Sequence, residues 1–238
     1  MRGWWQEITG LVLPVDCAGC GRPRTELCER CRVLIGGAAG SVPVRRVHPT
    51  PEPPGLPPVY AAGRYGDEVR AVVLAHKERG ALGLAGPLGT ALAAAVRRVG
   101  VTGTVLLVPV PSARRAVARR GHDATARIAR AAARELRRGG APARAVAALR
   151  QRRPVADQSG LGAAGRPVNL AGAVTAAGGA AGLLCAAPVV LVDDLMTTGA
   201  SLTVAARAVE AAGGRVAGAA VVAGPHDEEL HSDARRCR

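Results

Sequence analysis

Aromatic side chains are scarce in this chain of 238 residues: phenylalanine is absent, and tryptophan and tyrosine occur twice each. Alanine, valine and leucine must therefore fill the core, which suits helices packed closely on a parallel sheet. A platform on which nucleic-acid bases stack needs aromatic rings. Their scarcity argues against a protein that binds single strands by stacking.

Long apolar runs are also missing. No stretch reaches the roughly 18 consecutive apolar residues of a membrane span. The first residues are charged, and Pro14 follows before a long apolar run develops. Neither a membrane helix nor a signal peptide is expected, and we predict a cytoplasmic chain.

Acidic residues are few, with 18 Asp and Glu against 32 Lys and Arg, which gives a formal net charge of +14. This excess predicts attraction to anions such as nucleic acid, anionic lipid or a phosphorylated substrate. An equally acceptable interpretation is that arginine is simply the surface cation that this composition favours.

Four of the six cysteines form two Cys-x-x-Cys pairs near the N-terminus. The four residues are Cys17, Cys20, Cys28 and Cys31. Two such pairs are typical of a tetrahedral zinc site, and four thiolates leave no position open for a substrate, so the site is expected to be structural. A disulfide pair or a redox Cys-x-x-Cys is the alternative, but the joint presence of two pairs favours zinc.

The most informative stretch is 189–201, which reads Val-Val-Leu-Val-Asp-Asp-Leu-Met-Thr-Thr-Gly-Ala-Ser. An apolar run long enough for a buried strand meets two carboxylates, Asp193 and Asp194, and then small or hydroxylated residues. A helical pattern starts near Leu202 and ends at Gly213. The order is therefore strand, acidic pair, tight loop and helix.

This order favours a sugar phosphate. Backbone N–H groups of the loop and of the helix N-terminus bind a phosphate, and a carboxylate accepts hydrogen bonds from a vicinal diol or reaches a hydrated Mg²⁺. Because consecutive residues on a strand project to opposite faces, only one of Asp193 and Asp194 points squarely at a ligand unless the strand turns. The alternative is an ordinary strand-to-helix turn.

Hydrophobic periodicity predicts the rest of an α/β fold with a parallel sheet. Strands are expected at 59–65, 105–110, 145–149 and 216–223, and helices at 67–80, 84–99 and 123–138. Seven prolines between 36 and 58 predict a semi-extended linker that joins a core poorly. The expected units are 1–35 with the metal site, the linker 36–58, an α/β domain at 59–225 and a polar tail at 226–238.

Basic residues gather where a ligand is expected. Arg114 and Arg115 follow strand 105–110, at the carboxyl edge where α/β proteins bind ligands, and their forked donors suit a diphosphate. Lys77 lies on helix 67–80. The long basic stretch 150–169 is either a lid that closes over a phosphorylated substrate or plain disorder.

Residues 189–201 resemble the 5-phosphoribosyl-1-diphosphate (PRPP) binding motif of type I phosphoribosyltransferases. The resemblance implies that the acidic pair serves the ribose hydroxyls, that the loop holds the 5-phosphate, and that Mg²⁺, Lys77, Arg114 and Arg115 stabilise the departing diphosphate. The implied PRPP-binding residues are Asp193, Asp194, Met196, Thr197, Thr198, Gly199, Ala200 and Ser201.

Nearly the full chain resembles the ComF family, phosphoribosyltransferase-like proteins with an N-terminal zinc ribbon that are linked to DNA uptake in competence. The features that carry this resemblance are the double Cys-x-x-Cys, the helix with Lys77, the Val-Pro-Val-Pro strand with its arginines, the Arg-Gly-His-Asp segment, the spacing of Gln158, Leu161 and Asn169, and the acidic motif.

Two departures from the ComF pattern concern the diphosphate side of the site. The chain has Arg-Gly-His-Asp-Ala at 120–124 where the family commonly has Arg-Gly-Phe-Asn-Gln, and Val155 stands where a threonine is usual.

Two functions remain open at this point. The first is a PRPP-binding protein or phosphoribosyltransferase whose acceptor is unidentified, since no aromatic-bearing hood for a base is evident. The second is a non-catalytic DNA-uptake factor that binds single-stranded DNA or a competence helicase through the zinc ribbon and the basic surface.

Overall fold

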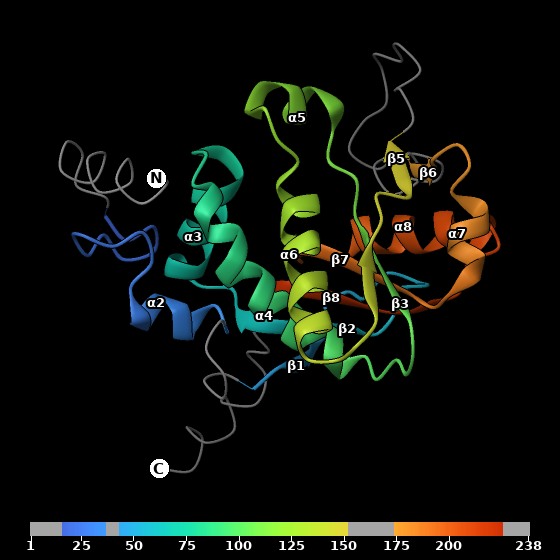
Figure 1. Ribbon diagram of the computed structural model, residues 1–238, viewed down its shortest axis with the longest axis horizontal. Coiled ribbons are helices and arrows are strands. Elements are labelled where there is room, and N and C mark those ends of the chain that lie inside the picture. Colours follow the sequence, from blue (N-terminus) through green and yellow to red (C-terminus); the bar gives the residue numbers. More distant parts are fainter. Residues whose placement is uncertain (1–15, 37–42, 152–173, 226–238) are drawn as a thin grey trace.

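A six-stranded, mostly parallel sheet lies at the centre of the computed structural model, which describes residues 16–36, 43–151 and 174–225 (Figure 1). Its strand order is β1-β2-β8-β7-β3-β4. The strands are β1 (Arg45–Val47), β2 (Val59–Arg64), β8 (Val216–Gly224), β7 (Val189–Leu195), β3 (Val105–Pro109) and β4 (Ala143–Ala145). All neighbours pair in parallel except β1, which is antiparallel to β2. The predicted α/β fold class is confirmed.

Helices cover both faces of this sheet. One face carries α3 (Asp67–Glu78), α4 (Ala85–Arg98) and α6 (Ala124–Arg138), and the other carries α7 (Ala181–Ala186) and α8 (Ala200–Ala211). Alternate residues of β7 enter the two cores, because strand side chains point to opposite faces in turn. Val190 and Val192 pack on the α4 and α6 side, whereas Val189 and Leu191 pack on the α8 side.

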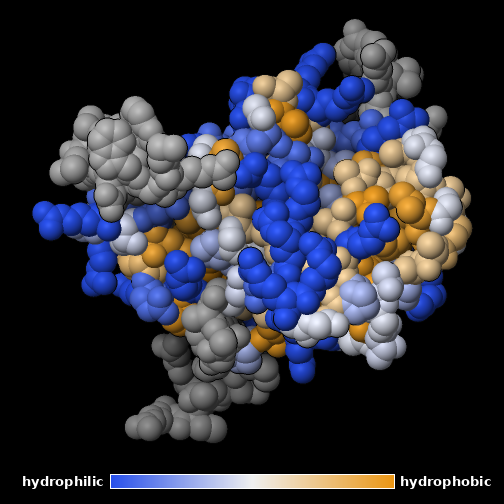
Figure 2. Space-filling view, viewed as in Figure 1, coloured by the Kyte–Doolittle hydropathy of each residue, from blue (hydrophilic) through white to orange (hydrophobic). Residues whose placement is uncertain are grey.

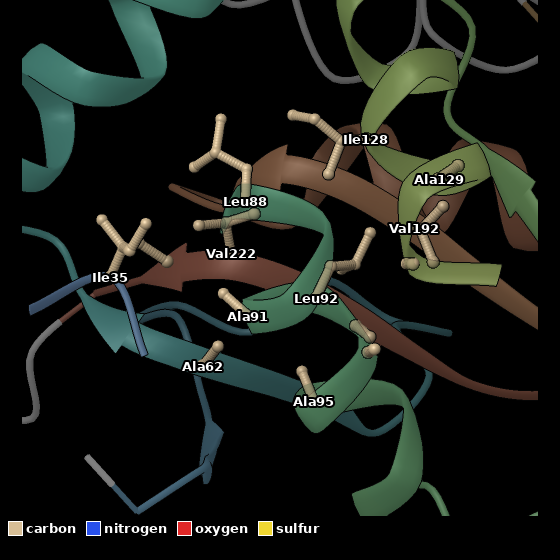
Figure 3. Packing of buried hydrophobic residues seen from close by; sticks show 14 of the residues in the cluster. Ile35, Ala62, Leu88, Ala91, Leu92, Ala95, Ile128, Ala129, Val192 and Val222 are labelled. Carbon is tan, nitrogen blue, oxygen red and sulfur yellow. The ribbon is translucent and has the colours of Figure 1, made fainter. Parts of the chain in front are cut away.

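The first of these cores consists mainly of alanine, valine and leucine, as the lack of aromatics requires (Figure 3). Leu88 and Leu92 of α4 lie beside Ile128 of α6 and above Val192 and Val222 of the sheet. Small residues let α4 and α6 approach closely. The two helices form the main cover of this face.

The helix at 123–138 and its cap are predicted well. In α6, Ile128, Ala132 and Leu136 are buried. Asp123 accepts a hydrogen bond from the backbone N–H of Ala126 at 3.0 Å and caps the helix. The predictions at 67–80 and 84–99 are also confirmed as α3 and α4, the latter preceded by a short 3-10 turn, η1 (Leu82–Leu84).

One predicted element is wrong, and one helix was not predicted. The single strand at 145–149 is two strands, β4 and β5 (Leu149–Gln151), and β5 pairs with β6 (Val174–Ala176) in a separate two-stranded sheet. The helix that was not predicted, α5 (Arg114–Arg120), follows β3, and none of its residues is buried. Periodicity could not reveal α5, because it has no apolar face to bury.

Part of the predicted linker belongs to the sheet. β1 pairs with β2, and its Val47 is 1% exposed in the second core. Arg207 of α8 donates to the Pro54 carbonyl at 3.0 Å, and Leu56 packs against the same core. The expectation that 36–58 joins the core poorly is therefore wrong for this part. Six of the seven prolines follow the strand and Pro43 precedes it, so none lies where a ladder hydrogen bond is needed.

In the described part of the chain, no single helix is long and apolar enough to cross a membrane. One pair, α3 with residues 82–98, meets the length and composition only when both parts are counted across a bend of 116°.

Candidate functional site

The acidic pair lies at the carboxyl end of β7, inside the strand and not after it. Asp194 follows Val190 and Val192 on the side of α3 and α6, and it is 3% exposed. Asp193 follows Leu191 in the alternation and is only half-buried. The two carboxylates therefore differ in their access to solvent.

Both oxygens of Asp194 have partners within the chain. Oδ2 lies 2.7 Å from Nζ of Lys77, and Oδ1 accepts a hydrogen bond from the backbone N–H of Leu195 at 2.8 Å. Burial lowers the pKa of Lys77, but the charges of Asp194 and Asp193 outweigh it and raise the pKa above its ordinary value. Lys77 is thus firmly cationic, with its side chain 32% exposed.

The carboxylate of Asp193 lies in an unfavourable electrostatic environment. Its Oδ1 accepts the backbone N–H of Asp194 at 2.8 Å. Burial, followed by the charge of Asp194, raises the pKa of Asp193 well above its ordinary value, and the charge of Lys77 only partly opposes this. Asp193 is therefore harder to ionise than an ordinary aspartate, and it lies at the edge of the sheet where a ligand would bind.

The raised pKa of Asp193 predicts a pH-dependent stability. The stabilising contribution of this group is full below its unfolded pKa, near 3.8, and is lost as the pH rises through the higher folded pKa. We therefore expect Asp193→Asn to be more stable than the wild type at about pH 7 and equal to it near pH 4, as measured by urea unfolding. Asp67→Asn, at an exposed position in the first turn of α3, is the control and should not become more stable at about pH 7, because it loses only a favourable charge near a helix N-terminus. A destabilised Asp193→Asn at neutral pH would contradict this account.

The loop after β7 turns sharply into α8. Gly199 has φ +73°, in the left-handed region that favours glycine, and Ala200, which begins the helix, donates its backbone N–H to the Thr198 hydroxyl at 3.5 Å. Thr197 and Thr198 are exposed. The first N–H groups of α8 and these hydroxyls lie together at the carboxyl edge, which is the arrangement that binds a phosphate.

Two other predicted loop residues differ in exposure. Ser201, in the first turn of α8, is exposed. Met196 is 2% exposed and packs in the second core, so its side chain faces the protein interior. Only its main chain borders the loop.

Three consecutive residues of the last turn of α3 contact three different elements. The carbonyl of His76 lies 3.1 Å from Nε2 of His122, Lys77 pairs with Asp194 of β7, and Glu78 pairs with Arg119 and Arg120 of α5. His76 itself is fully buried, and burial lowers its pKa. This turn joins α5, the α5–α6 connection and the acidic pair.

Arg114 and Arg115 form the first turn of α5 and are exposed. α5 follows the carboxyl end of β3, so both lie beyond the same edge as the acidic pair. Gln151 donates to the Pro111 carbonyl at 3.0 Å, which brings the end of β5 to this edge as well. The predicted residues of the 150–169 stretch beyond Gln151 lie outside the described residues.

Positive charge extends well beyond this edge. Arg130, Arg134, Arg137 and Arg138 are exposed on α6, and Figure 2 shows hydrophilic residues gathered over α5 and α6. The charge excess therefore covers a broad face. It attracts anions generally and does not mark one site.

The four cysteines of the N-terminal segment come together. Their sulfur atoms all lie within 4.8 Å of one another, and three of the four residues are buried. They belong to the loop before α2 (Glu29–Leu34) and to α2 itself. Burial raises the pKa of the Cys17 thiol, but backbone N–H groups of Cys20, Cys28 and Gly19 outweigh this and lower the pKa to about 6. The cluster can hold a metal ion.

This cluster packs directly on the main fold. Cys17, Cys28 and Cys31 share the first core with Val72 of α3. A Cβ atom at Gly19 would lie 2.7 Å from Sγ of Cys31 and 3.2 Å from Val72, so glycine is needed at this contact. The four-cysteine segment and α3 are therefore in close contact.

One comparison with known proteins bears on this site. The family model of the phosphoribosyl transferase domain matches residues 169–238, which include β7, the acidic pair, the loop and α8. No curated protein matches the chain. The match, the α/β fold and the four-cysteine cluster together fit a type I phosphoribosyltransferase-like protein with an N-terminal zinc ribbon. None of them favours the DNA-uptake alternative, and membership of the ComF family stays a prediction.

Two contacts near this site were not predicted from the sequence. For the pairing of Glu78 with α5, the sequence offered no signal except that Glu78 follows Lys77. His122 stands where the ComF family commonly has phenylalanine, and the ring makes a polar contact to α3 that phenylalanine cannot make. Both contacts join residues more than 40 positions apart.

Proposed function

We propose that this chain binds PRPP or a related ribose 5-phosphate ester at the carboxyl end of β7. The observation that carries the proposal is the sequence of features at that edge: two acidic residues, a left-handed turn at Gly199 and the N-terminus of α8. The turn and helix supply N–H groups for the 5-phosphate, and the carboxylates supply acceptors for the ribose diol. The family match over the same residues supports this assignment.

The proposed reaction class is phosphoribosyl transfer. In this reaction the bond between ribose C1 and diphosphate breaks, an acceptor nucleophile bonds to C1, and positive charge develops on the sugar ring. Lys77 and the acidic pair would flank the ribose, and Arg114 and Arg115, beyond the same edge of the sheet, would donate to the leaving diphosphate. Asp193 and Asp194 would reach a hydrated Mg²⁺ ion, which would supply further neutralisation of the leaving diphosphate.

We also propose zinc as the ion of the four-cysteine cluster, because a closed set of four thiolates is typical of structural zinc. The same proposal divides the chain into a zinc ribbon at 1–35, a connection at 36–58, a phosphoribosyltransferase-like domain at 59–225 and a tail at 226–238. The connection includes β1 and is thus partly ordered on the sheet.

Calorimetric titration with PRPP tests the proposed function. The wild type should give a saturable heat that depends on Mg²⁺, and Asp193→Asn with Asp194→Asn should give none, because the diol and the diphosphate-bound cation then lose their carboxylates. The matched control is Asp67→Asn with Glu210→Gln, which removes two charges at exposed positions and should bind as the wild type does. Absence of heat with the wild type would overturn the proposal.

A further inference from the structure

Helix α5 is attached to the rest of the fold through charged side chains. None of its residues is buried, and its apolar residues Ala116 and Val117 belong to neither of the two cores. In Figure 1 the helix lies apart from the layers formed by the sheet and the other helices. A helix without a buried apolar face depends on polar contacts to hold it in place.

Among the described residues, both ion pairs that join α5 to another element end on Glu78 of α3. Oε2 of Glu78 lies 3.1 Å from Nη2 of Arg119, and Oε1 lies 3.0 Å from Nη1 of Arg120. The side chain of Arg120 is only 5% exposed, and its Nε donates to the carbonyl of Ala116 at 3.0 Å. Because water screens a buried pair less than an open one, the pair with Arg120 is the stronger of the two. Glu78 therefore holds the C-terminal turn of α5 at two points.

The other end of α5 carries two cations. Arg114 and Arg115 form the first turn and are exposed, and neither has an ion-pair partner in the described part of the chain. From Arg114 to Arg120 the helix rises about 9 Å, so a tilt of about 20° at Glu78 would move the first turn by about 3 Å. Arginine donors bind an anion well only when their direction and distance match its oxygens. The attachment at one end of α5 thus sets the place of the cations at the other.

From these contacts we propose that Glu78 is a positioning residue that fixes α5 on α3, so that Arg114 and Arg115 face an anion bound at the carboxyl edge of the sheet. The anion is the diphosphate group of the ligand, and in this respect the proposal rests on the proposed function. Glu78 acts through Arg119 and Arg120 and does not touch the ligand. A carboxylate in contact with a diphosphate would repel it, whereas this one strengthens its binding.

The charge of Glu78 and its positioning role predict opposite effects of Glu78→Gln. Removing a negative charge near the site would by itself tighten the binding of an anion. Releasing α5 would weaken it, and we expect this effect to dominate. Calorimetry with inorganic diphosphate and Mg²⁺, and with PRPP, should show affinities lower by about 5- to 30-fold, the range for two partly exposed ion pairs. Ribose 5-phosphate lacks the diphosphate, so its affinity should stay within about twofold of the wild type, because its phosphate binds at the N-terminus of α8.

Glu68→Gln is the matched control, since it makes the same change of charge on the same helix. Glu68 pairs with Arg30 at 3.1 Å, so its ion pair joins α3 to the four-cysteine segment and not to α5. Its side chain is 33% exposed, against 37% for Glu78. This variant should bind all three ligands as the wild type does. Unchanged or tighter diphosphate binding by Glu78→Gln, or equal losses for diphosphate and ribose 5-phosphate, would overturn the proposal.

Failure of this proposal and failure of the proposed function can be told apart. If the wild type binds neither PRPP nor diphosphate, the proposed function fails, and amide hydrogen exchange of residues 117–121 still decides whether Glu78 holds α5. Exchange there should be at least about fivefold faster in Glu78→Gln and in Arg120→Gln. The double variant should exchange more slowly than the product of the two single effects, because both changes remove the same ion pair. Unchanged exchange in the single variants, or effects that multiply in the double variant, would overturn the attachment.

Discussion

Purified Cys28→Ser protein is expected to contain far less than one zinc per chain, where the wild type should contain about one. Cys28 supplies one of four sulfurs that lie within 4.8 Å of one another, and a serine hydroxyl is a poor replacement for a thiolate. Zinc binding contributes about 10–16 kcal/mol in small zinc-finger peptides at neutral pH, so its loss is large compared with ordinary domain stability. Elemental analysis after gel filtration measures the metal, and thermal unfolding measures the consequence.

Cys185→Ser is the matched control for this experiment. Cys185 is an exposed thiol of α7, on the face of the sheet opposite to the four-cysteine cluster. It should keep the metal content and the unfolding temperature of the wild type. A Cys28→Ser protein with full metal content would contradict the four-sulfur site, and one that loses metal without losing stability would contradict its structural role.

Gly89→Ala is expected to destabilise the fold by about 1–3 kcal/mol, the usual cost of overpacking a core. Gly89 of α4 faces α6, and a Cβ atom there would lie 2.9 Å from backbone atoms of Ala131 and Ala132. Backbone cannot rotate aside as a flexible side chain can. The closest contact of the two helices would therefore have to open, and urea unfolding measures the cost.

Gly182→Ala, at an exposed position in α7, is the control with the same chemical change. A Cβ atom at Gly182 meets nothing within 4 Å. Alanine favours a helix over glycine by up to about 1 kcal/mol, so this variant should be no less stable than the wild type. Opposite signs at the two positions would show that packing, not helix propensity, decides the effect at Gly89. The same sign at both would contradict the close contact between α4 and α6.

The local parts of the site could be predicted from sequence. β7, the tight turn and α8 are encoded within one continuous stretch, where an apolar run, Gly199 and helical spacing follow one another. The cap at Asp123 and the cysteine pairs are equally local signals. In each case the residues that interact are close in the chain, so their spacing carries the information.

The contacts that assemble the site could not be predicted in the same way. Lys77 and Asp194 lie far apart in the sequence, and only the folding of the chain brings the last turn of α3 to the end of β7. β1 was not predicted, because prolines flank it and because three residues are too few to show an alternating pattern. α5 was not predicted, because an arginine-rich segment with no buried face shows no hydrophobic periodicity that would distinguish a helix from a loop.

The cysteine cluster and the sheet share one core, and this limits the exchange of the N-terminal segment for that of another protein. Ile35 is fully buried beside the cluster, and the carbonyl of Leu34 lies 2.9 Å from where Gly63 of β2 would carry a Cβ atom. The N-terminal segment is therefore fitted to this particular sheet. Exchange with the corresponding segment of another protein would have to preserve the residues that face α3 and β2, so the two parts are expected to be inherited together.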